Sequence, residues 1–398
     1  MKRSWRVRPA RVDRGVNRLV QRTGSRTVIL VHATDIMAGG ERSLLNLLRH
    51  FDRSKFHAWV VCDASDDFAE AVHETGAPVT RVRFPGLRLP GLAAWRAVSG
   101  LLATSRSSGA ALLHANTPRT NLYTAVAGRL AGIPVVWHCR NLLETGMWDT
   151  DRIFAWLPDR IICNSDAIAA RFAGSRWQHR VRTILNGVDL GEFHPDISGA
   201  TVRDELGWVR NPIIAATSRL DPEKGHETLL EAMCTVAKQI PESRLLIAGI
   251  ASVNQATRHA VLQRRISELK LDGVVRLLGF RRDIPQLLAA ADICVLPADA
   301  EACGRVLFEA MAMTKPIVAT ASGGTPEIVV DAVTGVLVPP KDSRALADAL
   351  VALLKNPALR NAMGAAGRER VTKQFSIEAH VQKTMDVYAE ALTARGIR

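Results

Sequence analysis

The sequence predicts an α/β protein made of two successive doubly wound domains, each a parallel sheet with helices on both faces. Its 398 residues are enough for two domains of ordinary size. Short β-branched runs alternate with amphipathic stretches, which is typical of parallel sheets covered by helices. The alternation breaks over residues 186–210 into Gly, Pro and acidic residues and then restarts, which indicates a linker.

The first domain is expected over residues 27–190. It opens with the apolar run 27–33, the pattern of a strand buried on both faces. A turn at Gly39-Gly40 follows, and leucines then recur at helical spacing. The remaining strands are expected at 58–62, 79–82, 111–114, 135–138, 160–163 and 182–185, with a helix at 121–131 among the connections.

The second domain is expected over residues 211–375, after a linker at 191–210. A C-terminal helix at 376–398 is expected to pack back toward the first domain. The strands of the second domain are expected at 212–217, 244–248, 274–278, 293–296, 317–319 and 336–338. Ligands of such sheets bind at the carboxyl ends of the strands, so the residues that follow each strand are candidates for a site in the cleft between the domains.

The net charge of +13 is concentrated at the N-terminus. Residues 1–26 contain nine Lys and Arg side chains and one Asp, so this basic tail alone carries +8. Two interpretations stay open: attraction to an anionic membrane surface, or a solvated, flexible extension. Nucleic acid is not expected as a partner, since no zinc-finger spacing or basic–aromatic interleaving accompanies the charge.

The composition favours a cytoplasmic protein, with peripheral attachment to the inner face of the membrane as the open alternative. No apolar run is long enough for a spanning helix, which needs about 18 residues. No apolar core follows the basic start, as it would in a secretory signal. The six cysteines form no CxxC pair and no secreted-domain framework.

Two carboxylates, Glu301 and Glu309, flank Gly304 directly after an expected strand. Gly304 lets a backbone approach a ligand, and the helix that starts near Arg305 directs free N–H groups into the cleft. Glu309, about one turn into that helix, can accept hydrogen bonds from two vicinal hydroxyls, and Glu301 can hold a second set. The pair alone is also typical of an ordinary capped helix start.

Two cations, Arg219 and Lys224, follow the first strand of the second domain, with Pro222 just before a helix. Two cations and a helix N-terminus at one point suit a diphosphate. The bland alternative is a lysine in a first helical turn, which opposes the helix dipole. We therefore favour an anion site here.

Further candidates lie at other strand ends. Gly323-Gly324 is expected to form a backbone-lined turn beside the cleft. In the first domain, Gly39-Gly40 follows the first strand and His138 ends a later one. A histidine at a strand end is commonly structural, but its place on the cleft edge makes a catalytic role equally plausible.

These motifs together resemble glycosyltransferase family 4. The resemblance rests on SRLDPEKG, GFRRDIPQLLAAADICVLP, EACGRVLFEAM and TASGGTPEIV, preceded by a GG-x-E turn and an NGVD linker, and covers about residues 27–390. It implies the two-domain GT-B fold, two Rossmann-like domains facing across a cleft, and a retaining enzyme that uses a nucleotide-sugar donor.

The resemblance also implies roles for the residues. Arg219 and Lys224 would bind the donor diphosphate and stabilise it as the leaving group. Glu309 would bind the ribose and Glu301 the transferred sugar, while His138 would lie near the anomeric centre. The remaining residues expected at the donor are Gly39, Gly40, Cys303, Gly304 and Arg305.

The sequence departs from the family pattern in two places. The frequent His-Asp pair is here His138-Cys139-Arg140-Asn141, so any role of that Asp has no owner. Cys303 stands where an aromatic residue is often found, which leaves the shape of the sugar pocket open.

The expected function is transfer of a hexosyl unit from a UDP- or GDP-sugar to a glycan or lipid-linked acceptor, in polysaccharide or glycolipid biosynthesis. Fixed cations and helix N–H groups can stabilise the leaving diphosphate, so neither a metal nor a cofactor is expected. No carboxylate nucleophile is evident in the first domain, which favours a front-face route. Asp149-Thr-Asp151 fits a metal-binding DxD pattern, but it follows no apolar strand and is interpreted as a helix N-terminus.

Two other functions stay open at this point. A nucleotide-sugar epimerase of the same architecture would need further acid and base groups, which we cannot place. A non-catalytic sugar-nucleotide-binding protein is disfavoured by the intact set of cations and carboxylates. A dehydrogenase is disfavoured because no GxGxxG follows the first strand.

Overall fold

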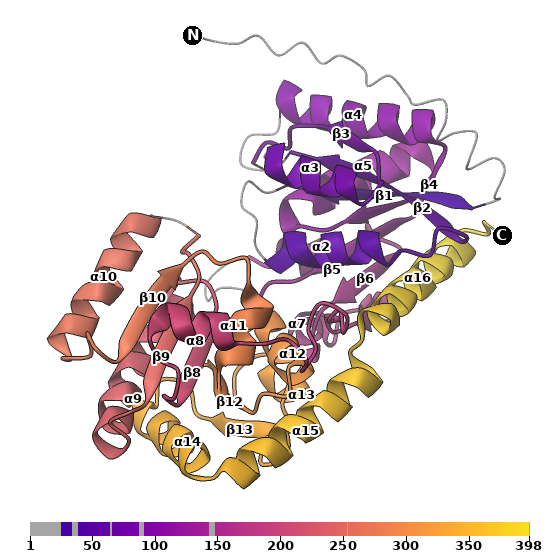
Figure 1. Ribbon diagram of the computed structural model, residues 1–398. Helices are drawn as coiled ribbons and strands as arrows, with labels where there is room; N and C mark the ends of the chain where they lie inside the picture. Colours follow the sequence, from indigo (N-terminus) through magenta and orange to yellow (C-terminus); the bar gives the residue numbers. More distant parts are fainter. Residues whose placement is uncertain are drawn as a thin grey trace.

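The computed structural model describes residues 25–33, 39–63, 66–86, 91–142, 148–252 and 254–397. Most of the basic tail, residues 1–24, therefore lies outside the described residues. Two parallel sheets form the frame of the molecule (Figure 1). The predicted α/β class with two doubly wound domains is confirmed.

The first sheet has seven strands in the order β3-β2-β1-β4-β5-β6-β7, and neighbouring strands pair in parallel. The strands are β1 (Arg26–His32), β2 (Phe56–Cys62), β3 (Val79–Arg81), β4 (Ala110–Ala115), β5 (Val135–Cys139), β6 (Arg160–Cys163) and β7 (Val181–Thr183). The helices between them are α2 (Gly39–Arg49), α3 (Asp66–Glu74), α4 (Leu92–Ser108), α5 (Pro118–Ala131), α6 (Thr150–Ile153) and α7 (Asp166–Ala169). Every strand expected from the sequence is present, with ends that move by two residues or fewer.

Successive residues of β1 face opposite layers of helices, as the pleat of a strand requires. Val28 and Leu30 pack in a core with α2, α3 and the C-terminal helix. Ile29 and Val31 pack in a second core with α4 and α5. Burial on both faces explains why the strands read as continuous apolar runs rather than as an alternating pattern.

The second sheet has six strands in the order β10-β9-β8-β11-β12-β13, again paired in parallel. The strands are β8 (Ile213–Thr217), β9 (Arg244–Ala248), β10 (Val275–Gly279), β11 (Ile293–Leu296), β12 (Ile317–Thr320) and β13 (Gly335–Val338). The helices are α8 (Ala200–Leu206), α9 (His226–Gln239), α10 (Gln255–Glu268), α11 (Ile284–Ala290), α12 (Arg305–Ala312), α13 (Thr325–Ile328), α14 (Ser343–Lys355), α15 (Pro357–Gln374) and α16 (Ile377–Ala394). Both sheets reverse their winding once, between β1 and β4 and between β8 and β11, and such switch points are where doubly wound sheets bind ligands.

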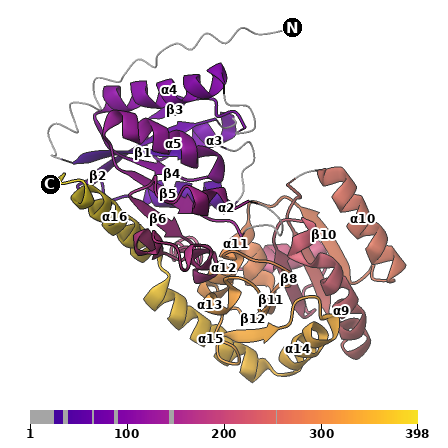
Figure 2. The same ribbon diagram turned by 180° about the vertical axis from the view of Figure 1, so that it is seen from behind.

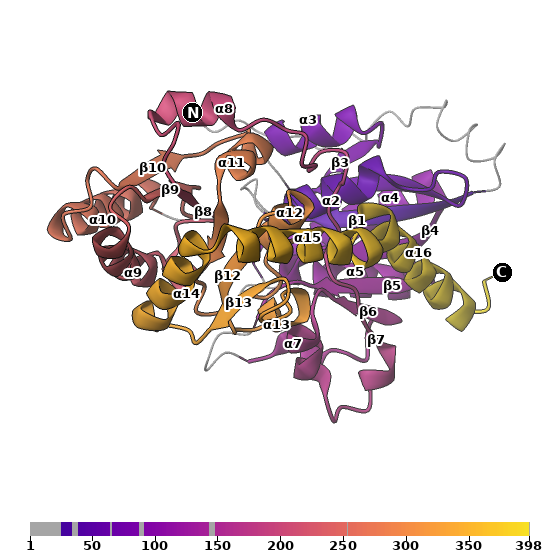
Figure 3. The same ribbon diagram turned by 60° about the horizontal axis from the view of Figure 1, so that its bottom comes forward.

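The chain crosses between the two sheets at residues 184–190 and again at the start of α16, and the two crossings touch. Val188 N–H donates to Phe375 O (3.0 Å) and Ile377 N–H donates to Val188 O (2.9 Å). A Cβ at Gly187 would lie 2.8 Å from the Ile377 Cα, so only glycine permits this approach. Helix α16 then lies against the first sheet, where it contacts β4, β5, β6 and α2 (Figure 3).

The domain boundaries drawn from the sequence stay predictions, but the structure adds detail near two of them. Strand β1 begins at Arg26, within the segment assigned to the tail. The segment assigned to the linker contains helix α8, whose Val202 is buried in the core of the second domain.

Candidate active site

Lys224 and Glu301 form a buried ion pair at the carboxyl ends of β8 and β11. The Lys224 Nζ lies 2.7 Å from Glu301 Oε2, and each side chain is about nine-tenths buried. Lys224 ends a short 3₁₀ turn, Pro222–Lys224, and the next residue, Gly225, has a φ of +69°. A Cβ at Gly225 would lie 1.9 Å from Pro297 O, so glycine is required where this turn meets the strand-end loop.

Arg219 follows β8 but does not join this pair. Its guanidinium forms an ion pair with Asp221, contacts Ser252 Oγ and lies 3.4 Å from Glu223 Oε1. Asp221 is itself fixed, because its two oxygens accept hydrogen bonds from Ser252 N–H and Oγ–H, each at 2.8 Å. The Arg219 side chain is 41% exposed, so it stays accessible to a ligand.

Arg305 connects the two domains at the start of α12. Its guanidinium lies 3.0 Å from Glu309 Oε1 and donates to Gly39 O at 3.4 Å. The expected turn at Gly39-Gly40 is wrong: these residues form the first turn of α2. The apolar face formed by the leucines behind them favours a helix here.

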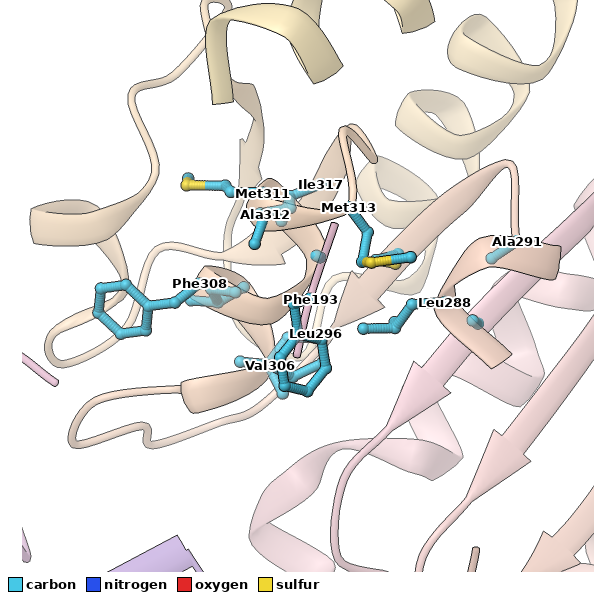
Figure 4. Packing of buried hydrophobic residues seen from close by; sticks show 14 of the residues in the cluster. Phe193, Leu288, Ala291, Leu296, Val306, Phe308, Met311, Ala312, Met313 and Ile317 are labelled. Carbon is cyan, nitrogen blue, oxygen red and sulfur yellow. The ribbon is translucent and has the colours of Figure 1, made fainter. Parts of the chain in front are cut away.

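The buried side of α12 is apolar. Phe308, Met311 and Ala312 of this helix pack with Leu296 of β11 and Phe193 (Figure 4). This packing fixes the helix and therefore the position of its polar residue, Glu309.

Two glycines hold the loop that carries Glu301. Gly323 has a φ of +51°, and a Cβ there would lie 2.0 Å from Glu301 O. Gly324 N–H donates to the same carbonyl at 2.9 Å. Gly304 is also closely packed, since a Cβ there would meet Leu296 Cδ2 at 2.6 Å, and its expected contact with the donor stays a prediction. Core packing thus already requires this glycine.

Cys303 is buried beside these groups, and burial raises the pKa of its thiol to about 12. The Cys303 side chain is neutral and is smaller than the aromatic side chain that is often found at this position in the family. Its carbonyl accepts a hydrogen bond from Asn186 Nδ2 at 3.5 Å, so Cys303 also ties the second domain to the first crossing segment.

His138 lies at the end of β5 and is almost fully buried. Its Nδ1 lies 3.1 Å from the Arg140 guanidinium, and its ring stacks on His114 with centroids 5.4 Å apart. Burial, followed by the charge of Arg140, holds the pKa of His138 well below its ordinary value. Its Nε2 has no hydrogen-bond partner among the described residues.

Arg140 is the part of this site that the sequence analysis missed. Its guanidinium makes five hydrogen bonds, to Ser43, Asn116 (two), Asn186 and His138, at 3.0 to 3.3 Å. No carboxylate of the described residues forms an ion pair with it. Burial lowers the pKa of Arg140 to about 10. Its place two residues after His138 was the one available signal, because its other partners come from three distant segments.

Asp149 and Asp151 are engaged elsewhere. Asp149 caps α6 by accepting from Arg152 N–H at 3.0 Å, which confirms that this motif is a helix N-terminus. Both carboxylates also form ion pairs with Arg171, at 2.6 and 3.2 Å. Arg171 thus offsets part of the charge of these two carboxylates.

Two family profiles match this chain. The profile described as Glycosyltransferase Family 4 matches residues 37–192, and that described as Glycosyl transferases group 1 matches residues 200–370. The chain belongs to glycosyltransferase family 4. The resemblance seen in the sequence motifs is therefore confirmed.

Solved structures support the GT-B architecture. The Anabaena protein HepE, crystallised in complex with UDP and glucose, is 26% identical and superposes with a TM-score of 0.81 over 92% of this chain and 99% of that one. A sucrose-phosphate synthase from Thermosynechococcus elongatus, at 23% identity, shares the fold with a TM-score of 0.76. The expected GT-B architecture is confirmed.

Curated relatives match over shorter stretches. A D-inositol 3-phosphate glycosyltransferase from Saccharomonospora viridis is 32% identical over 245 residues, which cover 59% of this chain and 56% of that protein. A GDP-mannose-dependent phosphatidylinositol monomannoside mannosyltransferase from Corynebacterium glutamicum is 37% identical over 205 residues, which cover 48% of this chain and 52% of that protein. The matched stretches thus span about half the length of these relatives.

Proposed function

We propose that this protein is a retaining glycosyltransferase that moves a hexosyl unit from a nucleotide-diphosphate sugar to a glycan or lipid-linked acceptor, without a metal ion. The observation that carries the proposal is the buried Lys224–Glu301 pair at the carboxyl ends of β8 and β11. A lysine ammonium has three donors, and Glu301 occupies one of them. The others would serve a phosphate oxygen. Glu301 Oε1 accepts from Cys303 N–H at 3.3 Å and keeps a lone pair that would accept from a sugar hydroxyl.

The other cations of the second domain fit the departure of a diphosphate. Arg219 precedes Lys224 by five residues in the sequence, and its side chain is partly exposed. Arg305 lies in the first turn of α12. Fixed cations of this kind stabilise the negative charge that develops on the leaving group. In this mechanism Glu309 holds the ribose hydroxyls and keeps Arg305 in place through their 3.0 Å contact.

The stereochemical part of the proposal rests on the first domain. A double displacement needs a carboxylate nucleophile next to the anomeric carbon. Glu41, in the first turn of α2, is buried and engaged with His32 Nε2 at 2.8 Å. We therefore favour a front-face route, in which the acceptor enters on the side from which the diphosphate leaves.

The donor and acceptor classes follow the relatives. HepE is solved with UDP-glucose, and the Corynebacterium relative is named for GDP-mannose and a phosphatidylinositol-based acceptor. We accordingly propose a UDP- or GDP-hexose as donor, and a glycan or lipid-linked acceptor.

We place the protein in the cytoplasm, with peripheral contact to an anionic membrane. Among the described residues, no helix is long and apolar enough to cross a bilayer. The basic tail supplies attraction to anionic lipid, each cation contributing on the order of 1 kcal/mol.

The test is a donor screen with the purified full chain. UDP- and GDP-hexoses are offered with and without glycan and phosphoinositide acceptors, and nucleotide release and product are both followed. A transferase releases nucleotide in step with a glycosylated product, whose anomeric configuration NMR compares with that of the donor.

Three outcomes would overturn the proposal. An epimerase changes the sugar while it stays attached to the nucleotide. A binding protein shifts its melting temperature with the donor but releases no nucleotide. An inverted anomeric centre in the product would remove the retaining mechanism.

A further inference from the structure

The two helical layers of the first domain carry opposite charge. Helices α4 and α5, on one face of the sheet, contain four arginines and no Asp or Glu. All four are exposed: Arg96, Arg106, Arg119 and Arg129. On the other face, α3 contains no Lys or Arg and exposes Asp67, Glu70 and Glu74. In the same layer α2 adds two arginines and one glutamate, and α16 adds one lysine and three carboxylates, so the layer is acidic in sum. The domain is thus polarised across its sheet.

The basic face is also apolar. Leu92, Trp95 and Leu130 are each more than half exposed, and Val126 is 42% exposed. Arg129 stacks on Trp156, which extends the surface beyond the end of α5. We call this set of seven residues the α4–α5 surface: Leu92, Trp95, Arg96, Val126, Arg129, Leu130 and Trp156.

A pocket of about 310 Å³ opens between α4 and α5. Its lining includes Ala94, Trp95, Val98, Leu122 and Val126. Tyr123 also lines it, but its hydroxyl donates to Pro85 O at 2.8 Å and so is already paired. The pocket therefore suits a hydrocarbon group.

The second domain does not cover this surface. Figures 1 and 2, which view the molecule from opposite sides, both place α4 at the end of the first domain that lies away from the second sheet. Exposed tryptophan, leucine and arginine on one face are the composition of proteins that lie on a membrane.

We propose that the α4–α5 surface docks on an anionic lipid bilayer, with tryptophan and leucine side chains in the interface and the pocket taking part of an acyl chain. A second copy of the chain is a poor occupant, since a symmetric contact would set arginine against arginine. Nucleic acid would match the arginines but not the leucines or the pocket. The inference rests on the proposed lipid-linked acceptor for its purpose, although the docking itself needs no transfer.

The test is co-sedimentation of the full chain with vesicles of phosphatidylcholine and phosphatidylglycerol, and with phosphatidylcholine alone, at low and high salt. Trp95→Gln with Leu130→Gln, and Arg96→Gln with Arg129→Gln, alter exposed side chains, so folding should persist. We expect Arg96→Gln with Arg129→Gln to weaken binding to anionic vesicles about 10- to 30-fold, since one cation contributes roughly fivefold. Trp95→Gln with Leu130→Gln should also weaken binding, because apolar area is lost from the membrane interface. Arg264→Gln with Lys373→Gln, on the second domain, is the matched control.

Binding by the two α4–α5 variants equal to that of the parent would overturn the proposal and leave the basic tail as the membrane contact. No vesicle binding by the parent would overturn it as well. Transfer to a soluble acceptor is assayed in parallel: if it persists in all variants while docking fails, the proposed function survives and only the docking is lost.

An independent observation concerns His138 and Arg140. A guanidinium can only donate hydrogen bonds, so the 3.1 Å contact makes His138 Nδ1 an acceptor. The neutral ring must then carry its proton on Nε2, the buried atom with no partner among the described residues. A carboxylate in the place of Arg140 would do the opposite and leave Nε2 as a base.

The geometry points to Arg140 as a positioning residue that sets His138 as a neutral hydrogen-bond donor to the bound ligand. The groups that face the ring agree with this. Arg140 is cationic, and His114 and His380 would each add positive charge if protonated, so all three oppose an imidazolium. The hydroxyl of Tyr388, on α16, lies 2.6 Å from Nδ1 of His114 and so fixes that ring.

Ring ¹⁵N NMR of the histidine-labelled full chain tests this, with His138 assigned by the signal that His138→Gln removes. We expect the Nε2–H tautomer, unprotonated at neutral pH. Arg140→Met should disturb the tautomer and lower kcat/KM about 10- to 100-fold. Arg140→Lys, which keeps a cationic donor, should recover part of the activity.

A proton on Nδ1 of the parent, or a charged ring at neutral pH, would overturn this assignment. An unchanged His138 spectrum in Arg140→Met would do so too. If Arg140→Met does not fold, the position of the ring proton of His138 in the parent protein still tests the assignment.

Discussion

The two sides of the candidate site balance their cations in different ways. In the second domain every candidate cation faces a carboxylate: Lys224 meets Glu301 at 2.7 Å and Arg305 meets Glu309 at 3.0 Å. On the first-domain side Arg140, beside His138, donates its hydrogen bonds to neutral groups alone.

This difference separates two uses of positive charge. A cation paired with a carboxylate recovers part of its desolvation cost through the pair and can share its free donors with a phosphate when one arrives. The charge of Arg140, which no carboxylate contacts directly and which Glu41 offsets only from a distance, acts on its neighbours whether or not a ligand is bound. The histidines around Arg140 feel that charge, and the second-domain site has no equivalent.

The largest effect that we expect is a loss of folding stability at acidic pH, caused by buried histidines close to Arg140. Burial lowers the pKa of His114 to about 3 and that of His380 to about 4, against 6.5 in the unfolded chain. The unfolded state therefore takes up protons first, so the stabilisation is complete above pH 6.5 and falls as the pH drops. For His380 the loss by about pH 4 is about 3 kcal/mol.

Thermal melts between neutral pH and about pH 4 measure this loss. His380→Gln, which can keep a donor to Leu185 O, should melt with a flatter pH dependence than the parent. His259→Gln on α10 serves as a control outside the cluster. Identical pH slopes in the parent and His380→Gln would show that the buried histidines do not set acid stability.

The same contrast explains what could be predicted from the sequence. The strands were readable because buried parallel strands are continuous apolar runs. Glu301 and Glu309 were readable because one loop and one helix place them, so their spacing is local. The Arg140 network was not, because Ser43, Asn116 and Asn186 reach it from separate strand ends that only the sheet order brings together.

A local pattern also does not reveal which partner a side chain chooses. Arg219 and Lys224 lie five residues apart and were expected to act as one cluster. In the structure Lys224 turns to Glu301, whereas Arg219 pairs with Asp221 and Glu223. The choice depends on the turn at Gly225 and on Ser252, which is remote in sequence.

The next largest effect is expected from Lys224→Ala. In the proposed mechanism this change removes a donor to the leaving diphosphate, and it leaves Glu301 buried without its cation. We expect both kcat and donor affinity to fall, with kcat/KM reduced about 10- to 150-fold. Steady-state kinetics with varied donor measure this, and Lys373→Ala, an exposed lysine, is the control. Wild-type kcat/KM in Lys224→Ala would contradict the site assignment.

A smaller and more selective effect is expected from Glu309→Ala. Ribose binding contributes equally to the ground state and the transition state, so its loss should raise the donor KM about tenfold and leave kcat nearly unchanged. Arg305 also loses its 3.0 Å partner, so Glu309→Gln, which keeps an acceptor oxygen, should be milder. A fall in kcat with an unchanged KM would place Glu309 at the reacting bonds instead of the ribose.

The removal of divalent metal comes last in this order, because we expect it to leave the rate of transfer unchanged. If Lys224, Arg219 and Arg305 stabilise the leaving diphosphate, the charge that a metal would supply is already provided by the protein. The acidic motif that a metal-dependent enzyme would use is engaged with Arg171, at 2.6 Å from Asp149 and 3.2 Å from Asp151. Initial rates after dialysis against EDTA should therefore equal those with added Mg²⁺ or Mn²⁺. Loss of turnover that either ion restores would contradict this, and Asp149→Asn would then show whether the motif must leave Arg171 to hold the ion.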